Sequence, residues 1–257
     1  MTQFPPVRPV ALIAHRGYSA RAPENTLASL EAAVLAGSDG IEWDISTTAC
    51  GTPVLFHDAT LERTTSGHGA LAEISWPELR DLDAGGWFDS MFAGERVPSL
   101  QQACEAVGAW GYDGRIVAEI KGWNTEADVD RMVETMIRTG RHDQTRYIAI
   151  NWAAIHRIAH AFPGAPVAFI VERPERFEDA LGRAASVEGA GLAVDFRILL
   201  DDPRRLEAAL SRGLTVGVWT VDDPTAASRL HALGIRDFTT NEVERLRAWA
   251  DALEDPQ

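Results

Sequence analysis

The chain repeats one local pattern: a short β-branched apolar run, a stretch with helical periodicity, and a Gly or Pro break. Eight runs are expected to be strands, at residues 10–14, 40–46, 115–121, 146–151, 166–171, 191–196, 215–220 and 236–240. Helical patterns occupy residues 25–36, 99–109, 125–139, 153–162, 176–185, 203–212, 224–233 and 243–253. This alternation implies right-handed crossovers and a parallel sheet, and eight units predict an α/β fold closed as a TIM-type (β/α)8 barrel. A doubly wound open sheet is the alternative.

The domain organisation follows from length and from the absence of linkers in the sequence. A chain of 257 residues can bury one large core, and its Gly and Pro residues are scattered singly between the periodic segments. We therefore expect a single barrel domain over residues 1–257. Residues 52–98 break the rhythm, with a short strand at 54–57 and then a loop-rich stretch containing Trp and Gly. This segment is interpreted as an insertion over the barrel mouth.

Charge and composition exclude several classes of partner and compartment. The net charge of −14 argues against a nucleic-acid backbone or an anionic lipid surface as the main partner. Two cysteines, Cys50 and Cys104, are too few for a disulfide framework. The first apolar run reads as a strand rather than a signal peptide, and no run approaches the length of a membrane span. These features predict a cytoplasmic protein without stable membrane insertion; the oligomeric state stays open.

Acidic residues recur with a spacing of two on two predicted strands. Glu42 and Asp44 lie two apart, as do Glu119 and Lys121, so each pair points to one face of its strand. On an isolated half-exposed strand such carboxylates would face solvent. In a barrel, however, helices cover the outer face, and the apolar residues between the carboxylates belong there. Three carboxylates at the inner mouth would suit a divalent cation with oxygen ligands, Mg²⁺ or Ca²⁺.

Two histidines follow apolar runs next to this acidic group. His15 and His57 each end a predicted strand, which fits a general acid and base pair because imidazole titrates near neutral pH. Arg16 and Lys121 supply positive charge for an anionic group, and their alternative is ion pairing with the carboxylates. Trp219 ends another strand, where it forms either an apolar wall of the pocket or part of the core.

The residues that open the first helix are weaker candidates. Glu24 and Asn25 lie near the acidic and basic groups in the sequence and are kept as supporting residues of the site. The alternative for Asn25 is that it caps the helix.

A set of short motifs carries a family resemblance. They are HRG at residues 15–17, PENT at 23–26, ExD at 42–44, HD at 57–58, LxRTT at 61–65 and ExK at 119–121. In this order they resemble the glycerophosphodiester phosphodiesterase family, which is related to the phosphatidylinositol-specific phospholipase C barrels. The sequence departs from the family pattern at residues 49–51, where a polar residue and Asp usually precede Gly, and at Asn241, where Asp is common.

The resemblance implies roles for the candidate residues. It implies that Glu42, Asp44 and Glu119 bind a divalent metal, and that His15 and His57 act as acid and base. It also implies that Arg16 and Lys121 hold the phosphate.

The implied reaction is hydrolysis of a small-molecule glycerophosphodiester to sn-glycerol 3-phosphate and an alcohol. Two alternatives stand beside it: a lysophospholipase D acting on lipids that keep one acyl chain, and a barrel that binds a phosphorylated ligand without turnover. Neither the order of histidine roles nor the choice between water and a glycerol hydroxyl as nucleophile is fixed by the sequence.

Overall fold

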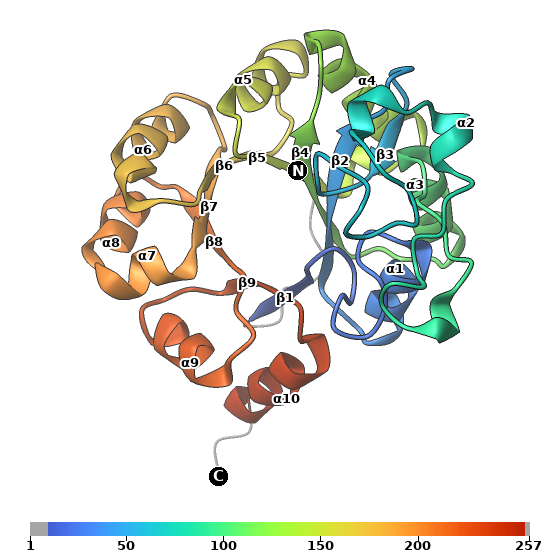
Figure 1. The fold of residues 1–257 in the computed structure, drawn as a ribbon. Coiled ribbons are helices and arrows are strands. Elements are labelled where there is room, and N and C mark those ends of the chain that lie inside the picture. The colour runs from blue at the N-terminus through green and yellow to red at the C-terminus, as the bar shows by residue number, and fades with distance from the viewer. Residues whose placement is uncertain (1–9, 255–257) are drawn as a thin grey trace.

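The strands form one closed sheet in the computed structural model, which describes residues 10–254. The strands are β1 Ala11–Ala14, β2 Gly40–Thr47, β3 Pro53–Leu55, β4 Arg115–Gly122, β5 Thr145–Ala149, β6 Val167–Val171, β7 Gly191–Asp195, β8 Thr215–Trp219 and β9 Asp237–Thr240. β1 pairs in parallel with both β9 and β2, so the sheet closes into a ring (Figure 1). The barrel prediction is confirmed, and the open sheet is excluded. The ends of the predicted domain 1–257 lie outside the described residues.

Helices surround the barrel (Figure 1). They are α1 Leu27–Leu35, α2 Trp76–Leu79, α3 Leu100–Ala109, α4 Glu126–Arg138, α5 Trp152–Ala161, α6 Phe177–Ala185, α7 Phe196–Asp201, α8 Arg204–Leu210, α9 Pro224–Ala232 and α10 Val243–Glu254. Short 3-10 turns occur at η1 Leu71–Glu73, η2 Ser90–Phe92, η3 His142–Gln144 and η4 Pro174–Arg176. Every helix expected from the sequence is present. Asn25 does not cap α1, because the cap is Thr26, whose side chain accepts a hydrogen bond from the Ser29 backbone N–H.

Several strands end one or two residues away from their predicted ends, including β5, expected at 146–151. The strand expected at 54–57 ends at Leu55 as β3, which runs antiparallel to β2, so His57 does not end a strand. The backbone N–H of Phe56 still donates to the carbonyl of Asp44 at 3.0 Å, in the register of the β2–β3 pair, and His57 follows this bond near the barrel mouth. The strand expected to reach 196 ends at Asp195, whose side chain caps α7, a short helix that the apolar pattern did not reveal.

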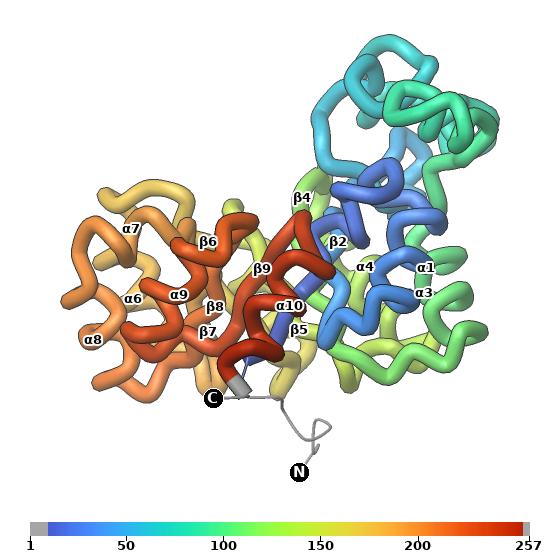
Figure 2. The backbone as a smooth tube through the Cα atoms, turned by 90° about the horizontal axis from the view of Figure 1, so that it is seen from below, coloured from blue at the N-terminus to red at the C-terminus, as the bar shows by residue number. Residues whose placement is uncertain are grey.

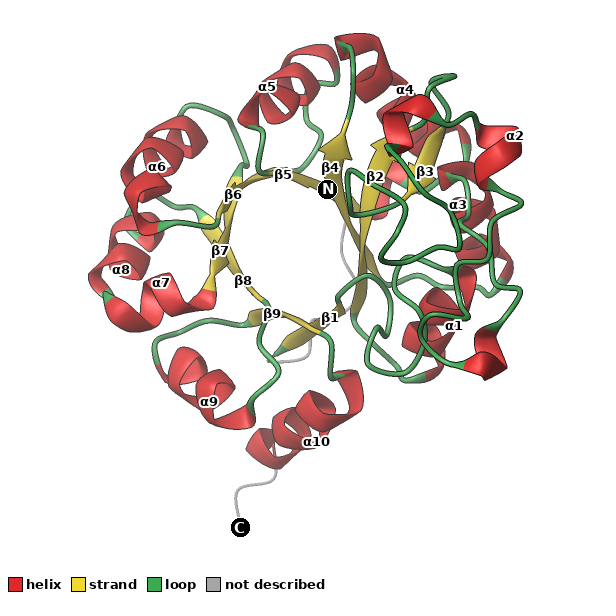
Figure 3. Cartoon of the chain, viewed as in Figure 1, coloured by secondary structure: helices red, strands yellow, loops and turns green. Residues whose placement is uncertain are grey.

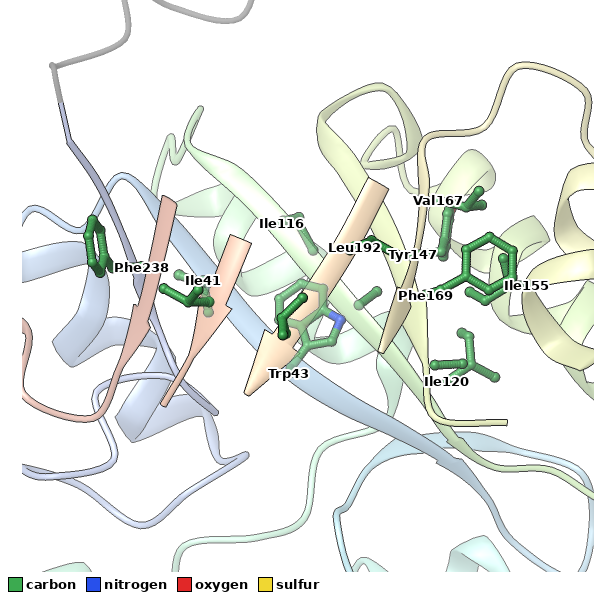
Figure 4. Packing of buried hydrophobic residues seen from close by; sticks show 14 of the residues in the cluster. Ile41, Trp43, Ile116, Ile120, Tyr147, Ile155, Val167, Phe169, Leu192 and Phe238 are labelled. Carbon is green, nitrogen blue, oxygen red and sulfur yellow. The ribbon is translucent and has the colours of Figure 1, made fainter. Parts of the chain in front are cut away.

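The main core lies between the barrel and the helices. Ile41 and Trp43 of β2, Ile116 of β4 and Phe169 of β6 are fully buried there (Figure 4). Ile45 of β2 is fully buried in the same cluster. Side chains alternate along a strand, so if Ile41, Trp43 and Ile45 face the helices, Glu42 and Asp44 between them face the barrel interior. The apolar residues of β2 thus determine where its carboxylates point.

The stretch between β3 and α3 is mostly loop (Figure 3) and stands beyond the rest of the barrel on the side of α1 and α3 (Figure 2). It has a small apolar cluster of its own, which includes Phe56, Leu61 and Leu79. Its status as an insertion into one barrel domain stays a prediction. Among residues 10–254, no helix is long and apolar enough to cross a membrane.

Candidate active site

Three carboxylates converge where β2 and β4 end at the barrel mouth. Glu42, Asp44 and Glu119 each offer an oxygen, and these oxygens lie within 4.8 Å of one another. The pairing of β2 with β4 sets Asp44 opposite Glu119, which explains why residues so distant in sequence meet. The exposed fraction of each residue is 9% or less. The structure therefore brings together the acidic residues that the sequence singled out.

Burial and mutual repulsion shift the pKa values of this cluster. Burial, followed by the charges of Asp44 and Glu119, raises the pKa of the Glu42 carboxyl well above its ordinary value. Burial and the charge of Asp44 raise the pKa of Glu119 to about 7. Burial alone would raise the pKa of Asp44 as well, but the positive charges of Arg16 and Lys121 outweigh it and hold that pKa below its ordinary range. The cluster thus concentrates negative charge that a cation would relieve.

The donor atoms fit a hard divalent cation. Asp44 Oδ1 is buried and has no hydrogen-bond partner among the described residues; the Lys121 ammonium lies 3.6 Å from it. A carboxylate oxygen left unpaired in the interior is costly, and an ion coordinated there would remove the cost. All three candidate ligands are oxygen donors, the type preferred by Mg²⁺ and Ca²⁺.

Two cations flank the cluster, and both form ion pairs. Lys121 Nζ lies 3.0 Å from Glu119 Oε1, and Arg16 Nε lies 3.2 Å from Asp44 Oδ2 without hydrogen-bond geometry. Arg16 Nη1 donates to Glu24 Oε1 at 2.7 Å. The ion-pair alternative for Arg16 and Lys121 is therefore present in the structure, although both side chains also line the cavity at the mouth.

Backbone conformation builds the corner that follows β1. Arg16 and Gly17 have φ angles of 56° and 77°, and the turned backbone N–H of Arg16 donates to Glu42 Oε2 at 2.8 Å. A Cβ at position 17 would lie 2.5 Å from Ser29, so only glycine fits there. Asn25, with a φ of 58°, donates from Nδ2 to Asp44 Oδ2 at 2.8 Å and accepts from the Asp44 backbone N–H. The first motif region thus orients two of the carboxylates.

His15 is held by residues that follow the last strand. Its Nδ1 lies 2.7 Å from Asn241 Oδ1. The Asn241 side chain donates from Nδ2 to Asp222 at 2.7 Å, so its oxygen is the group that faces the imidazole. Since that oxygen can only accept, His15 Nδ1 carries the proton, and in the neutral ring Nε2 is free to accept. Nε2 lies 3.9 Å from Glu42, on the side of the cluster.

Burial and the charge of Arg16 lower the pKa of His15 to about 4. The imidazole is therefore neutral at pH 7. A neutral ring with a free Nε2 next to the carboxylates is in the protonation state that a general base requires.

His57 has a charged partner instead. Its Nδ1 lies 2.5 Å from Asp58 Oδ1, and Arg63 donates from Nε to Asp58 Oδ2 at 2.6 Å. Arg63 also donates to both carboxylate oxygens of Glu24 at 2.8 Å. Hydrogen bonds from Arg63 hold the pKa of Asp58 well below its usual range, so a carboxylate faces the imidazole. Burial and the charge of Arg16 lower the pKa of His57, and the charge of Asp44 and the hydrogen bond to Asp58 partly oppose this.

Comparison with known proteins decides the family. The model of the glycerophosphoryl diester phosphodiesterase family matches residues 15–245. The chain belongs to this family. A glycerophosphodiester phosphodiesterase of Caldanaerobacter subterraneus subsp. tengcongensis is 27% identical over 237 residues, which cover 91% of this chain and 95% of that protein. Human glycerophosphodiester phosphodiesterase 1 is 43% identical over 96 residues, covering 37% of this chain and 29% of that protein.

A solved structure supports the family assignment. A phosphodiesterase from Oleispira antarctica, in complex with the product sn-glycerol-3-phosphate, superimposes with a TM-score of 0.83 at 26% identity, covering 94% of this chain and 96% of that one.

A cavity of about 200 Å³ opens at this site of the family barrel. His15, His57 and Lys121 line it, and so does Trp219, whose indole N–H donates to the Ala193 carbonyl at 3.1 Å. Trp219 is half-buried, so it is a wall of the cavity rather than a fully buried core residue.

Sequence reasoning did not assign a role to Arg63, Asn241 or Asp222. Arg63 was visible as the Arg of the LxRTT motif, five residues after Asp58, and this proximity could have suggested the pair. Asp222 follows β8 and Asn241 follows β9. The carboxyl ends of adjacent parallel strands meet at the barrel mouth, so these positions also carried a usable signal.

Proposed function

We propose that this family member is a metal-dependent hydrolase that converts glycerophosphodiesters to sn-glycerol 3-phosphate and an alcohol. The observation that carries the proposal is the convergence of Glu42, Asp44 and Glu119 between two differently partnered histidines. The product bound in the Oleispira antarctica relative supports the substrate class. In this proposal the three carboxylates hold Mg²⁺ or Ca²⁺.

Charge neutralisation is the first task in hydrolysis of a phosphodiester. The diester carries a negative charge that repels nucleophiles, and charge builds on the non-bridging oxygens in the transition state. The guanidinium of Arg16 and the ammonium of Lys121 line the cavity and would contact these oxygens. A divalent cation, when bound, supplies further Lewis-acid charge there. Arg16 is also fixed by Glu24, which limits the entropy lost on substrate binding.

His15 is the proposed general base. Its Nδ1–H is committed to Asn241, its pKa of about 4 keeps it neutral, and its Nε2 faces the cluster. In the reaction Nε2 takes the proton of the attacking hydroxyl as that oxygen bonds to phosphorus. Asn241 is neutral, so its hydrogen bond orients the ring and raises the pKa of His15 less than burial and the charge of Arg16 lower it.

His57 is the proposed general acid. The Asp58 carboxylate faces Nδ1 at 2.5 Å and favours the protonated ring against the burial that lowers the pKa of His57, and the protonated ring can donate from Nε2. As the bond between phosphorus and the alcohol oxygen breaks, His57 gives its proton to that oxygen. Arg63 acts as a positioning residue, because it holds Asp58 with two hydrogen bonds and anchors it to Glu24.

The size of the cavity favours a small alcohol over an acylated lipid. Its volume of about 200 Å³ is below the range of roughly 300–1,000 Å³ for pockets of drug-sized ligands. We therefore place lysophospholipase D activity second. A barrel that binds without turnover ranks third, because both histidines and all three carboxylates are present in one site.

The test measures glycerol 3-phosphate release from glycerophosphocholine and glycerophosphoethanolamine. We expect release to stop with EDTA and to return with Mg²⁺ or Ca²⁺. Glu42→Gln should abolish the response to metal, while Glu134→Gln, an exposed substitution on α4, serves as the matched control. Lysophospholipid turnover without glycerophosphodiester turnover would transfer the proposal to the second candidate. Lack of turnover of both by folded, metal-supplemented protein would leave only a binding role.

A further inference from the structure

The interior of this barrel is less filled than a barrel core normally is. Interior positions of a (β/α)8 barrel usually carry layers of bulky branched side chains that leave no pore. Here three neighbouring strands contribute Ala168, Ala193 and Gly217 to the lining of the cavity. The cavity of about 200 Å³ therefore extends from the carboxylate cluster into the barrel, between the apolar side chains of Ile148 and Ile170.

The deep part of this cavity has a positive charge. Arg115, Arg146 and Asp237 line it, and Arg115 forms an ion pair with Asp237. Arg146 is half-buried, and its side chain makes no hydrogen bond or ion pair with any residue in the described part of the chain. Burial lowers the pKa of its guanidinium, and the charge of Asp237, which is already paired with Arg115, offsets this only in part. One guanidinium is thus left to bind an anion.

The two ends of the cavity are separated along the strands. On β4, Arg115 at the deep end and Glu119 at the mouth are four residues apart. Arg146 and Ile150, at and just beyond β5, have the same spacing. At the rise of a strand, four residues span about 13 Å. An apolar passage with a cationic deep end suits an elongated ligand with one anionic end. Water fits such a passage poorly, because apolar cavities offer it few hydrogen bonds.

We propose that the barrel interior below the carboxylate cluster is a binding site for a medium-chain alkyl carboxylate, with its carboxylate on Arg146 and its chain directed toward the mouth. The cavity is somewhat larger than an engineered cavity of about 150 Å³ that accepts benzene, so it suits a medium chain rather than a long one. His57, Lys121 and Trp219 line the same cavity at the mouth, so the ligand would compete with a diester there.

An alkyl carboxylate is a ligand that the proposed function would bring to this protein, and its suggested role as an inhibitor rests on that function. Glycerophosphodiesters arise from acylated lipids by ester hydrolysis, and that reaction releases one carboxylate for each acyl group removed. A carboxylate site within the same barrel would let the product of the preceding reaction class slow this one. Binding itself does not depend on turnover.

The experiment is isothermal titration calorimetry of octanoate into the full chain with Mg²⁺ present. Octanol, which lacks the charge, and butyrate, which lacks the chain, serve as matched ligands. We expect octanoate to bind at one site and both others to bind at least 10-fold more weakly. Arg146→Met should weaken octanoate binding by about 10-fold or more, as loss of a charge-assisted hydrogen bond does. Arg146→Lys should restore part of the affinity, and Arg80→Met, on the surface, should change nothing.

A second variant tests the cavity independently of the charge. A Cβ at position 217 would lie 3.7 Å from the Asp237 Cβ, an ordinary contact, so the first side-chain atom fits there, and the two methyl groups of Gly217→Val are expected to fill the passage. We expect this variant to lose octanoate binding and to keep its thermal unfolding temperature. Octanoate should raise the KM for glycerophosphocholine in the wild type and leave kcat unchanged.

Two results would overturn the site: no heat of octanoate binding to wild-type protein, or equal affinities in wild type and Gly217→Val. Octanoate binding by a protein without diesterase activity would contradict the proposed function alone.

Discussion

Removal of metal should make the stability of this protein fall as pH rises. Burial and the charge of Asp44 raise the pKa of Glu119 from 4.5 to about 7, whereas in the unfolded chain this carboxyl titrates near 4.5. Between these values the folded state binds more protons than the unfolded state, so the free energy of unfolding decreases with pH. The stability present below pH 4.5 is lost as the pH passes 7. At about 1.4 kcal/mol per pH unit, the loss amounts to about 3 kcal/mol.

Urea unfolding, followed by tryptophan fluorescence in EDTA at pH 5, 6, 7 and 8, measures this effect. The comparison is with Glu119→Gln, which keeps the shape of the side chain but cannot ionise. Because other groups titrate in both proteins, the difference between their unfolding free energies isolates Glu119. Relative to the wild type, the free energy of unfolding of the variant should rise by about 2.5 kcal/mol between pH 5 and pH 8, because pH 5 already lies above the unfolded-state pKa. Glu134→Gln, exposed on α4, should show no such gain.

Metal provides the converse test. A cation that binds the folded state stabilises it by mass action, so Mg²⁺ or Ca²⁺ should restore the wild type at pH 8 and help Glu119→Gln less. A difference between wild type and variant that stays constant from pH 5 to pH 8 would refute the reasoning. It would mean that Glu119 ionises freely in the folded protein and that the three carboxylates do not repel one another.

Three further predictions concern the histidines, their support and the core. His15→Ala and His57→Ala should each lower kcat by about 100-fold or more, with unchanged circular dichroism; normal turnover in both would remove the acid and base roles. Arg63→Met should lower kcat by about 10-fold while KM changes less, because Asp58 loses its anchor, and a selective rise in KM would argue against this positioning role. Phe169→Ala should cost about 3–5 kcal/mol in urea unfolding, since the ring is fully buried outside the barrel.

The fold could be predicted from the sequence because its period is local. Each apolar run predicts a strand and each helical stretch predicts a helix without reference to distant residues. Their strict alternation is compatible with only a few chain topologies. The failures occurred at the ends of elements. The antiparallel pairing of β3 with β2 ends with the bond from the Phe56 N–H to the Asp44 carbonyl, and the local pattern does not show this partner strand. β7 ends at Asp195 because that side chain caps α7 by accepting from the Arg197 N–H, a local cap that the apolar run concealed.

Part of the site could be predicted from the two-residue period of a strand, and the rest depends on contacts that form only when the barrel closes. Glu42 and Asp44 could be placed on one face because two-residue spacing fixes their relation, and the fully buried Trp43 between them fixes which face that is. The assignment of His15 as base needs Asn241, which is 226 positions away and becomes a neighbour only when β9 closes on β1. Closure therefore does more than complete the core. It sets a neutral amide, rather than a carboxylate, against His15, while His57 meets the carboxylate of the residue beside it, and this difference separates the proposed roles of the two histidines.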